Sequence, residues 1–187
     1  MNRHGLAPRA ASASRCTMTE LVLPGQANSF GSVFGGTIMS WVDLCAAIAA
    51  QRNAGRPVVT AFVDDLFFHG PVRVGEVACL EGTVTATFRT SLEVEVIVNG
   101  DEATSGRTWP CVRALLTFVA LGDDGKPTPV PPLLFEDDAG RARLTFGALG
   151  DAGTPTPVPP LLHEDDASRA RQAEAEERRA RRLAQKA

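Results

Sequence analysis

Asn28, the pair Gly35-Gly36 and Asp43 are the residues whose types and spacing could do chemistry in this chain. An amide can orient a water or a carbonyl group, and a carboxylate can take a proton from an attacking water. Adjacent glycines at the start of a helix leave backbone N–H groups open, and these can donate hydrogen bonds to an atom that gains negative charge. Because such glycine pairs are also common in turns, the pair alone is weak evidence, and the surrounding elements must show whether it begins a helix.

One long helix over residues 37–53 is expected to position Asp43. This stretch has no Pro or Gly, and an apolar stripe recurs at helical spacing. The stripe is Phe34, Ile38, Trp41, Val42, Cys45, Ile48 and Ala49. Because the other side is small or apolar apart from Asp43, the helix is expected inside a core. A carboxylate there needs partners, so Asp43 either bonds a nearby backbone or hydroxyl group, faces water, or has a chemical role.

The composition limits the classes of protein to which this chain can belong. At 187 residues with 44% hydrophobic content, the chain can build one sizeable core with tails. The net charge of −3 and pI near 5.6 argue against a nucleic-acid-binding domain, and no apolar run approaches the ~18 residues of a membrane span. The four cysteines form no CxxC pair, so we expect reduced thiols, three of them in the core, and no metal site.

The fold class follows from the strand-like runs around the helix. A short first strand is expected at 21–23, and Asn53-Ala-Gly-Arg-Pro57 ends the helix. Four more runs follow, with a turn expected at Asn99-Gly-Asp101; they are 58–68, 76–89, 92–98 and 112–121. One buried helix beside about five successive strands predicts an α+β fold in which an antiparallel sheet wraps the helix.

Seven blocks in the expected order resemble a known family. They include Pro24-Gly-Gln-Ala-Asn28, Phe34-Gly-Gly36, Trp41-Val-Asp43, Val59-Thr-Ala-Phe-Val-Asp64, Phe68-His-Gly-Pro-Val72, Arg89-Thr-Ser-Leu-Glu-Val94 and Thr117-Phe-Val-Ala120. Over roughly residues 20–133 the chain resembles the hotdog-fold acyl-CoA thioesterases, in the acyl-CoA hydrolase group related to brain-type cytosolic acyl-CoA hydrolases. The resemblance implies hydrolysis of acyl-CoA to free CoA and a carboxylic acid, without metal or redox cofactor.

The resemblance also implies a catalytic pair, Asn28 and Asp43. Asp43 lies seven residues beyond Gly36, which places it about 10 Å along the axis from its own helix N-terminus. In the resembled enzymes, Asp of one subunit meets Asn and the helix N-terminus of the other, so we expect a homodimer with a composite site and an inactive monomer. Dimers are expected to assemble into a homohexamer, a trimer of dimers.

The expected chemistry gives each site residue a role. Asp43 would activate water as general base, the Gly36 N–H would hold the oxyanion, and Asn28 would orient the water or thioester. Direct attack by Asp43 to form a mixed anhydride uses the same residues and stays open. Contacts to substrate or CoA are expected from Gly35, Thr60, Arg89, Thr90 and Ser91.

Three of these CoA contacts have alternatives. Thr90 and Ser91 could serve a hairpin turn, and Arg89 could form a surface ion pair with Glu93 or Glu95 instead of binding a CoA phosphate. Two other functions stay open. A non-catalytic acyl-CoA sensor would keep the fold without the base, and a hotdog enoyl-CoA hydratase would need an Asp–His pair that the three histidines are misplaced to supply.

The chain divides into four predicted regions. Residues 1–18 read as a disordered extension with a weak likeness to a transit peptide, 19–133 as the thioesterase domain, 134–163 as a Pro-rich linker and 164–187 as a charged, solvated helix. The linker arises because 116–143 recurs almost residue for residue as 144–171. The second copy is expected to be loosely packed, or to add an edge strand at 144–149. We expect a cytoplasmic protein.

Overall fold

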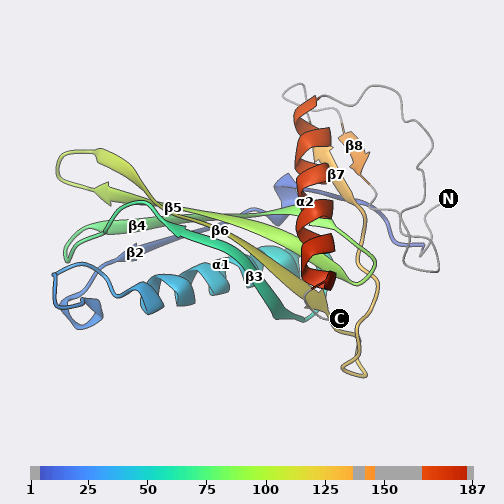
Figure 1. Cartoon of the computed structure of the whole chain (residues 1–187), viewed down its shortest axis with the longest axis horizontal. Coiled ribbons are helices and arrows are strands. Elements are labelled where there is room, and N and C mark those ends of the chain that lie inside the picture. Colours follow the sequence, from blue (N-terminus) through green and yellow to red (C-terminus); the bar gives the residue numbers. More distant parts are fainter. Residues whose placement is uncertain (1–4, 137–141, 146–165, 185–187) are drawn as a thin grey trace.

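In the computed structural model of this chain, a five-stranded antiparallel sheet and one long helix form the main body. The structure describes residues 5–136, 142–145 and 166–184 (Figure 1). The strand order is β2-β4-β5-β6-β3, with helix α1, Gly35–Ala54, against one face. The bounds are β2 Cys16–Leu21, β3 Val58–Phe68, β4 Val77–Thr87, β5 Ser91–Glu102 and β6 Arg107–Ala120. The predicted α+β arrangement is confirmed.

Helix α1 is followed by Gly55 as its C-cap residue, whose φ of 69° is the left-handed conformation that favours glycine. The Gly55 N–H donates to the carbonyl of Gln51 at 2.8 Å and closes the last turn. The guanidinium of Arg9 lies against Gly55, and Arg9 Nη1 donates to the Arg52 carbonyl at 2.6 Å. A side chain from far upstream therefore caps the helix C-terminus.

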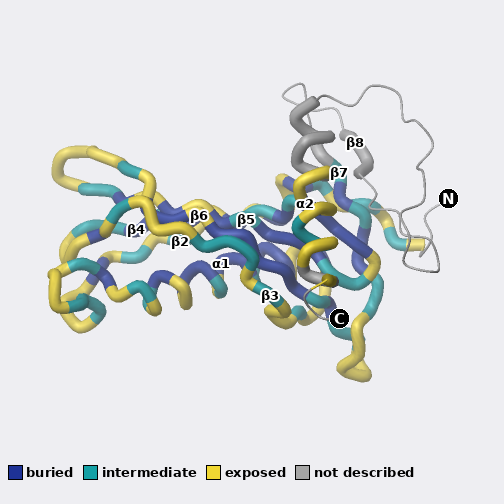
Figure 2. Tube along the Cα trace, viewed as in Figure 1, coloured by how far each residue is buried: buried dark blue, intermediate teal, exposed yellow. Residues whose placement is uncertain are grey.

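One face of α1 is buried against the sheet (Figure 2). Its side chains are small or apolar, which lets the helix approach closely. At Gly82 of β4, an added Cβ would lie 3.1 Å from Cys45 Sγ. The buried residues of this face include Ile38, Trp41, Val42, Cys45, Ala46, Ala49 and Ala50. Phe34, predicted to join the stripe, is 60% exposed, and Met39 and Leu44 are also exposed. The prediction that α1 is enclosed all round is therefore wrong for the single chain.

Two strand boundaries differ from the sequence prediction. The first strand of the main sheet is Cys16–Leu21 and not 21–23, because residues 16–21 pair with β4. Asn99-Gly-Asp101 lies inside β5, and the turn follows at 103–106. The ring of Trp109 covers Gly100 from the next strand, and a glycine inside a strand often marks such a close approach. Gly100 therefore makes room for an indole ring.

The N-terminal residues are more ordered than the sequence predicts. Within the range 1–18, expected to be disordered, residues 9 and 10 form β1 and residues 16–18 belong to β2. Strand β1, Arg9–Ala10, pairs in parallel with β7, Leu133–Glu136, and β7 pairs with β8, Ala142–Thr145. Residues 144 and 145 thus lie in an edge strand, while the rest of the second copy up to 165 lies outside the described residues.

The predicted C-terminal helix is present as α2, Asp166–Ala184. The prediction that it is wholly solvated is wrong, because Ala175 is buried and Arg178 pairs with Glu93 of β5. The neighbours of Glu93 on β5, Leu92 and Val94, belong to the core that α1 packs against. Since side chains alternate along a strand, α2 covers the face of the sheet opposite to α1.

Candidate active site

Asp43 lies on α1, half-buried, with its carboxylate directed at the edge strand β3. Thr60 Oγ1 donates a hydrogen bond to Asp43 Oδ1 at 2.7 Å. The structure gives Oδ2 no hydrogen bond within the described residues. A carboxylate held through one oxygen keeps the other available to accept a proton. Asp43 therefore does bond a hydroxyl group, as one of the alternatives predicted. This bond does not exclude a chemical role, because the same carboxylate has a second oxygen.

Asn28 stands in a tight loop that its own side chain closes. Its Oδ1 accepts hydrogen bonds from the N–H groups of Phe30 at 2.9 Å and Ser32 at 3.3 Å, and its Nδ2 donates to Ser32 Oγ at 3.1 Å. This is a local Asx-type turn. Because the oxygen is used within the loop, Asn28 can offer a ligand one remaining N–H of Nδ2 and no free acceptor.

The N-terminus of α1 presents uncapped backbone donors. Phe34 makes no side-chain cap, and no acidic residue lies in the first turn. The first bonds run from the N–H groups of Thr37 and Ile38 to the Phe34 carbonyl, and the described residues supply no acceptor for the N–H groups of Gly35 and Gly36. Open N–H groups and the helix dipole together favour an anion at this point.

The glycines at this terminus differ in how much space surrounds them. A Cβ added at Gly36 would lie 2.5 Å from the ring of Phe34, whereas one added at Gly35 would make an ordinary contact of 3.6 Å with Phe68. Phe34 is tied to the loop because its N–H donates to the Gln26 carbonyl at 2.8 Å. The absence of a side chain at Gly36 therefore allows the Phe34 ring to lie across the helix terminus.

The structure brings these residues together in two groups. The Asn28 loop adjoins the N-terminus of α1 through the bridge between Ala27 and Val33. Asp43 and Thr60 form the second group, and Asp43 is seven residues, about 10 Å, further along the helix than Gly36. The predicted separation of the carboxylate from its own helix N-terminus is thus present in the single chain.

The turn between β4 and β5 carries Arg89 and Thr90, and Ser91 begins β5. Its backbone is tied by hydrogen bonds from Phe88 N–H to Ser91 O at 2.8 Å and from Ala120 N–H to Thr90 O at 3.0 Å. The predicted hairpin location of Thr90 and Ser91 is therefore confirmed. Arg89 is exposed, and the carboxylates suggested as its partners are bonded to Arg178 and Arg113 instead. The surface ion pair predicted as an alternative for Arg89 is wrong.

This turn lies far from the Asn28 loop. The loop contacts the residues before β4, since Val74 N–H donates to Gly31 O at 3.1 Å, whereas the turn follows the other end of β4 (Figure 1). A strand of 11 residues spans roughly 35 Å. In register, Leu92 pairs with Phe118, which pairs with Thr60. The turn is therefore at the end of the sheet that also carries Thr60 and Asp43.

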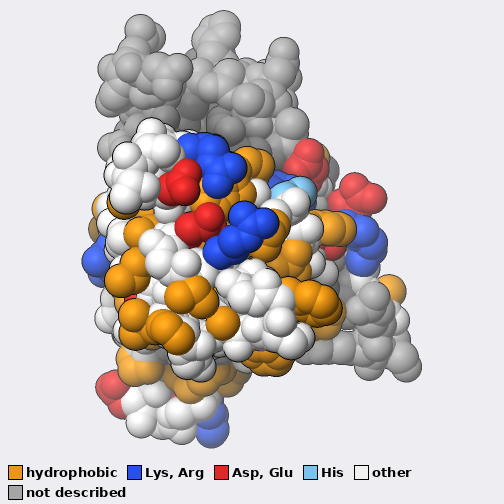
Figure 3. Space-filling model, turned by 90° about the vertical axis from the view of Figure 1, so that its left-hand side faces the viewer, with side chains coloured by type: hydrophobic (Ala, Val, Ile, Leu, Met, Phe, Trp, Pro, Cys, Tyr) orange, Lys and Arg blue, Asp and Glu red, His pale blue; other side chains and the backbone are white. Residues whose placement is uncertain are grey.

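Exposed apolar side chains surround both groups. Strand β3 is an edge strand, and its Val63 and Phe67 are 42% and 58% exposed. Figure 3 looks at the end of the molecule with the α1 N-terminus and shows hydrophobic side chains on its surface. Further exposed residues of this kind are Phe30, Phe34, Met39, Leu44, Val59 and Phe68. Large exposed apolar patches mark interaction sites.

Two details of the site were not predicted from the sequence. One is the hydrogen bond of Thr60 to Asp43, which joins residues 17 positions apart; the other is the use of the Asn28 oxygen within its own loop. The only available signal for the first was a lone hydroxyl in the apolar run 58–63. Among the described residues, no group of three or more His, Cys, Asp or Glu could hold a metal, and no helix could span a membrane.

Comparison with known proteins identifies the family. The sequence model described as "Thioesterase superfamily" matches residues 30–104. An acyl-CoA thioester hydrolase of Bacillus subtilis is 37% identical over 125 residues, covering 67% of this chain and 73% of the relative. The cytosolic acyl coenzyme A thioester hydrolase of Rattus norvegicus is 36% identical over 133 residues, covering 70% of this chain and 35% of the relative. The chain thus spans about a third of that relative's length, and 17% of a mouse relative's.

Solved structures share the fold along most of the chain. A hexameric acyl-CoA thioesterase without ligand superposes with a TM-score of 0.76 and 29% identity, covering 97% of this chain and 99% of that one. The acyl-CoA hydrolase of Staphylococcus aureus, solved with butyryl coenzyme A and coenzyme A, gives 0.73 and 29%, covering 95% and 92%. Variants of that enzyme with an asparagine, an aspartate or a threonine changed to alanine have also been solved. This chain therefore belongs to the thioesterase superfamily, in its group of hotdog-fold acyl-CoA thioester hydrolases.

Proposed function

We propose that this chain hydrolyses acyl-CoA thioesters to free CoA and a carboxylic acid. The observation that carries the proposal is the carboxylate of Asp43, bonded by Thr60 through one oxygen and open at the other, on a chain of this family. The Staphylococcus aureus variants support it, because the residue types changed there are those of Asn28, Asp43 and Thr60 here.

The proposed reaction uses these groups in order. Asp43 Oδ2 takes a proton from water as the water oxygen attacks the thioester carbon. The carbonyl oxygen gains negative charge and accepts a hydrogen bond from the Gly36 N–H, while the remaining N–H of Asn28 Nδ2 orients the water or the thioester. Collapse of the intermediate breaks the carbon–sulfur bond, and the thiolate of CoA leaves with the proton that Asp43 took from the water, which restores the carboxylate of Asp43. One preorganised donor of the Gly36 kind is worth about 3 kcal/mol in the transition state.

The site is proposed to form between two subunits. Asp43 lies about 10 Å from the terminus of its own helix, so Asp43 of one subunit would act with Asn28 and Gly36 of another. The exposed apolar surface of β3 and α1 supports such a contact, since it provides area for a partner of the same kind. The hexameric state of one structural relative supports assembly of dimers into a hexamer.

The CoA end of the substrate is proposed to bind near the β4–β5 turn. Arg89 is exposed there and could pair with a phosphate, with Thr90 and Ser91 beside it. Gly35, at the other end of the site, would let the substrate approach the α1 terminus of the partner. We place the protein in the cytoplasm, which is supported by the cytosolic name of the rat relative.

The test is thiol release from acyl-CoA esters of graded chain length. The full chain is expected to hydrolyse some member of the series, and Asp43→Asn should lower kcat by about 10²- to 10⁴-fold because the base is lost. Asp101→Asn, which removes a carboxylate near the end of β5, serves as the matched control and should keep activity. If the native chain binds acyl-CoA but releases no thiol from any ester, the protein is a sensor and the enzymatic proposal fails.

A further inference from the structure

Helix α2 packs directly behind the turn that carries Arg89. Ala175 has no exposed surface and forms a small apolar cluster with Ala86 and Phe88, at the end of β4. The guanidinium of Arg179 lies 4.9 Å from the centre of the Phe88 ring, a cation–π contact. Phe88 is the first residue of the turn, so α2 covers the back of the turn while Arg89 stays exposed.

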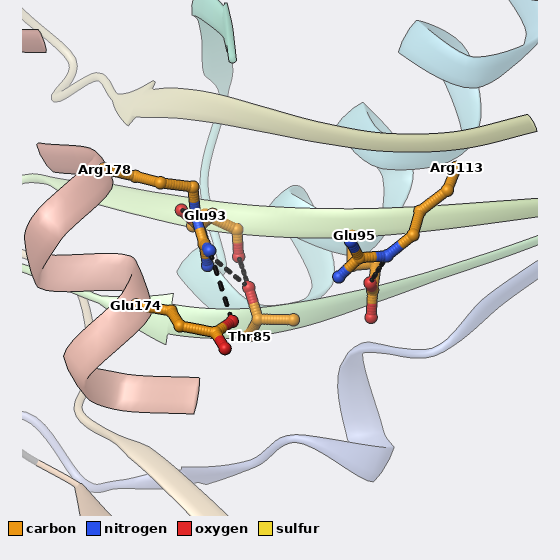
Figure 4. Close-up of polar contacts among 6 residues, drawn as sticks. All are labelled: Thr85, Glu93, Glu95, Arg113, Glu174 and Arg178. Atoms are coloured by element: carbon orange, nitrogen blue, oxygen red, sulfur yellow. Dashed lines mark hydrogen bonds and ion pairs between the residues drawn. The ribbon is translucent and has the colours of Figure 1, made fainter. Parts of the chain in front are cut away.

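A buried ion pair joins the same helix to β5 (Figure 4). Glu93 is 0% exposed, and Arg178 donates to both of its oxygens, from Nη2 to Oε1 at 2.8 Å and from Nε to Oε2 at 3.0 Å. Thr85 Oγ1 also donates to Glu93 Oε1 at 3.0 Å. The hydrogen bonds to Glu93, and a second pairing with Glu174, raise the pKa of Arg178. The two-pronged contact therefore ties α2 to the strand two residues after Ser91.

A second ion pair on the same face of β5 does not involve α2. Arg113 Nε lies 2.6 Å from Glu95 Oε1, and these side chains are 53% and 26% exposed (Figure 4). This pair joins β6 to β5 only. The two carboxylates are neighbours on one strand face, yet of the two only Glu93 takes its guanidinium from α2. Loss of α2 would leave Glu93 without its bidentate guanidinium and would uncover the ring of Phe88.

We propose that α2 is a positioning element for CoA recognition: Arg178 on Glu93 and Arg179 on Phe88 hold the β4–β5 turn so that Arg89 is placed for a phosphate of the CoA nucleotide. The inference rests on the proposed function for the identity of the ligand. It concerns affinity alone, since in the described part of the chain the ion pairs of α2 are to Glu93 and Glu174, and Asp43 is held by Thr60. It deepens the proposed site by adding a C-terminal element that carries none of its catalytic groups.

The inference predicts that a change in α2 alters KM for one substrate and not for another. An acyl-CoA uses the turn through its nucleotide, whereas the corresponding acyl-pantetheine thioester lacks the nucleotide and cannot. Arg178→Glu places a carboxylate against buried Glu93 and should raise KM for acyl-CoA by about tenfold, with kcat within about twofold and KM for acyl-pantetheine unchanged. The control Arg181→Glu reverses a charge at an exposed position of the same helix and should change neither.

A second pair of variants tests the inference even if Arg178→Glu does not fold. Glu93→Gln keeps the size of the side chain but removes the charge that holds Arg178, and Glu95→Gln makes the same change on the neighbouring pair. Glu93→Gln should raise KM for acyl-CoA in the same direction, and Glu95→Gln should not. An unchanged KM in folded Arg178→Glu, or an equal rise for both substrates, overturns the inference.

Calorimetric titration with CoA itself separates this inference from the proposed function. If the native chain hydrolyses no thioester but binds CoA, and Arg178→Glu weakens binding about tenfold, then the proposed hydrolysis fails while the role of α2 stands. If hydrolysis is present and CoA binding is equal in native chain and variant, the role of α2 fails alone. If the native chain binds no CoA, both fail.

Discussion

Thr60 is the side chain that orients Asp43, and its exposure makes this role easy to separate from stability. Thr60 lies on the edge strand β3, and its hydroxyl is the donor to Asp43 Oδ1 at 2.7 Å. A hydrogen bond to a charged acceptor contributes about 1.5–3 kcal/mol. The geometry of the carboxylate therefore depends on one replaceable group.

We expect Thr60→Val to lower kcat by about 10- to 100-fold, because valine has the shape of threonine but cannot donate to Asp43. Thr60→Ser keeps the hydroxyl and should retain most of the activity. Steady-state thiol release measures the effect, and thermal unfolding should show a small change in Tm for both variants. Equal loss of activity in the valine and serine variants would contradict the role of the hydroxyl.

The cysteines provide a second prediction at this scale. Burial raises the pKa of Cys45 to about 12, with Cys16 nearby adding to the effect, and burial raises that of Cys111 to about 11. The thiolate is the reactive form, so these thiols should resist alkylation by iodoacetamide at pH 8 in the folded protein. Cys79 is less buried and should react first. Mass spectrometry of peptides reads the sites, and all four thiols should react in denaturant.

At the scale of elements, the N-terminus of α1 combines an open backbone with an aromatic cover. The Phe34 ring lies against Gly36, and no side chain caps the helix there. A methyl group at Gly36 must displace this ring, although alanine is the better helix former by about 1 kcal/mol. Stability and activity should therefore respond in opposite directions to one substitution.

We expect Gly36→Ala to lower thiol release by about tenfold while the free energy of unfolding stays equal or rises. The displaced Phe34 ring would obstruct the proposed oxyanion site, which explains the loss. Gly25→Ala is the matched control, because an added Cβ there meets nothing within 4 Å. Full activity in Gly36→Ala would remove the Gly36 N–H from the proposed mechanism or show that the ring moves freely.

The elements that sequence reasoning predicted are those whose pattern is local. Helix α1 follows from an apolar stripe without Pro or Gly, and β3 to β6 follow from β-branched runs. The docking of α2 has no such signal, because its contact is made by Ala175, Arg178 and Arg179 rather than by an apolar stripe. The partner of Arg178 is Glu93, 85 residues away, and spacing within α2 says nothing about it.

Parts of the candidate site were predictable for the same reason. The separation of Gly36 from Asp43 is a property of one helix and could be computed from the sequence. The Thr60 donor joins two elements, and the order of residues 9–18 depends on pairing with β4 and β7. Such contacts are set by tertiary structure, which overrides local preference.

At the scale of the whole molecule, the two groups of site residues lie apart in one chain. If the proposed composite site is correct, activity requires two subunits, each of which supplies one group. Asn28→Asp is a suitable partner variant, since its carboxylate keeps the acceptors for the loop N–H groups, while it removes the Nδ2 donor and adds a negative charge that disfavours an oxyanion nearby. Asp43→Asn removes the base. Each variant alone should be inactive.

Mixing Asn28→Asp and Asp43→Asn subunits, with dissociation and reassembly, should restore about a quarter of native activity. Half of randomly formed dimers are mixed, and each mixed dimer has one site with both native residues and one with neither. Thiol release after co-refolding measures this, with each variant refolded alone as the control. Absence of any recovery in verified mixed dimers would show that Asn28 and Asp43 act within one subunit.

The buried pair of Glu93 and Arg178 also constrains how this lineage can change. Loss of either partner alone removes the bidentate contact from a charge that stays largely buried, whereas loss of both to apolar residues can be nearly neutral. A substitution that removes one of the two side chains is therefore penalised, whereas joint replacement by apolar residues is tolerated. Relatives that keep this contact between the C-terminal helix and the sheet should thus carry Glu93 and Arg178 together, or apolar residues at both positions.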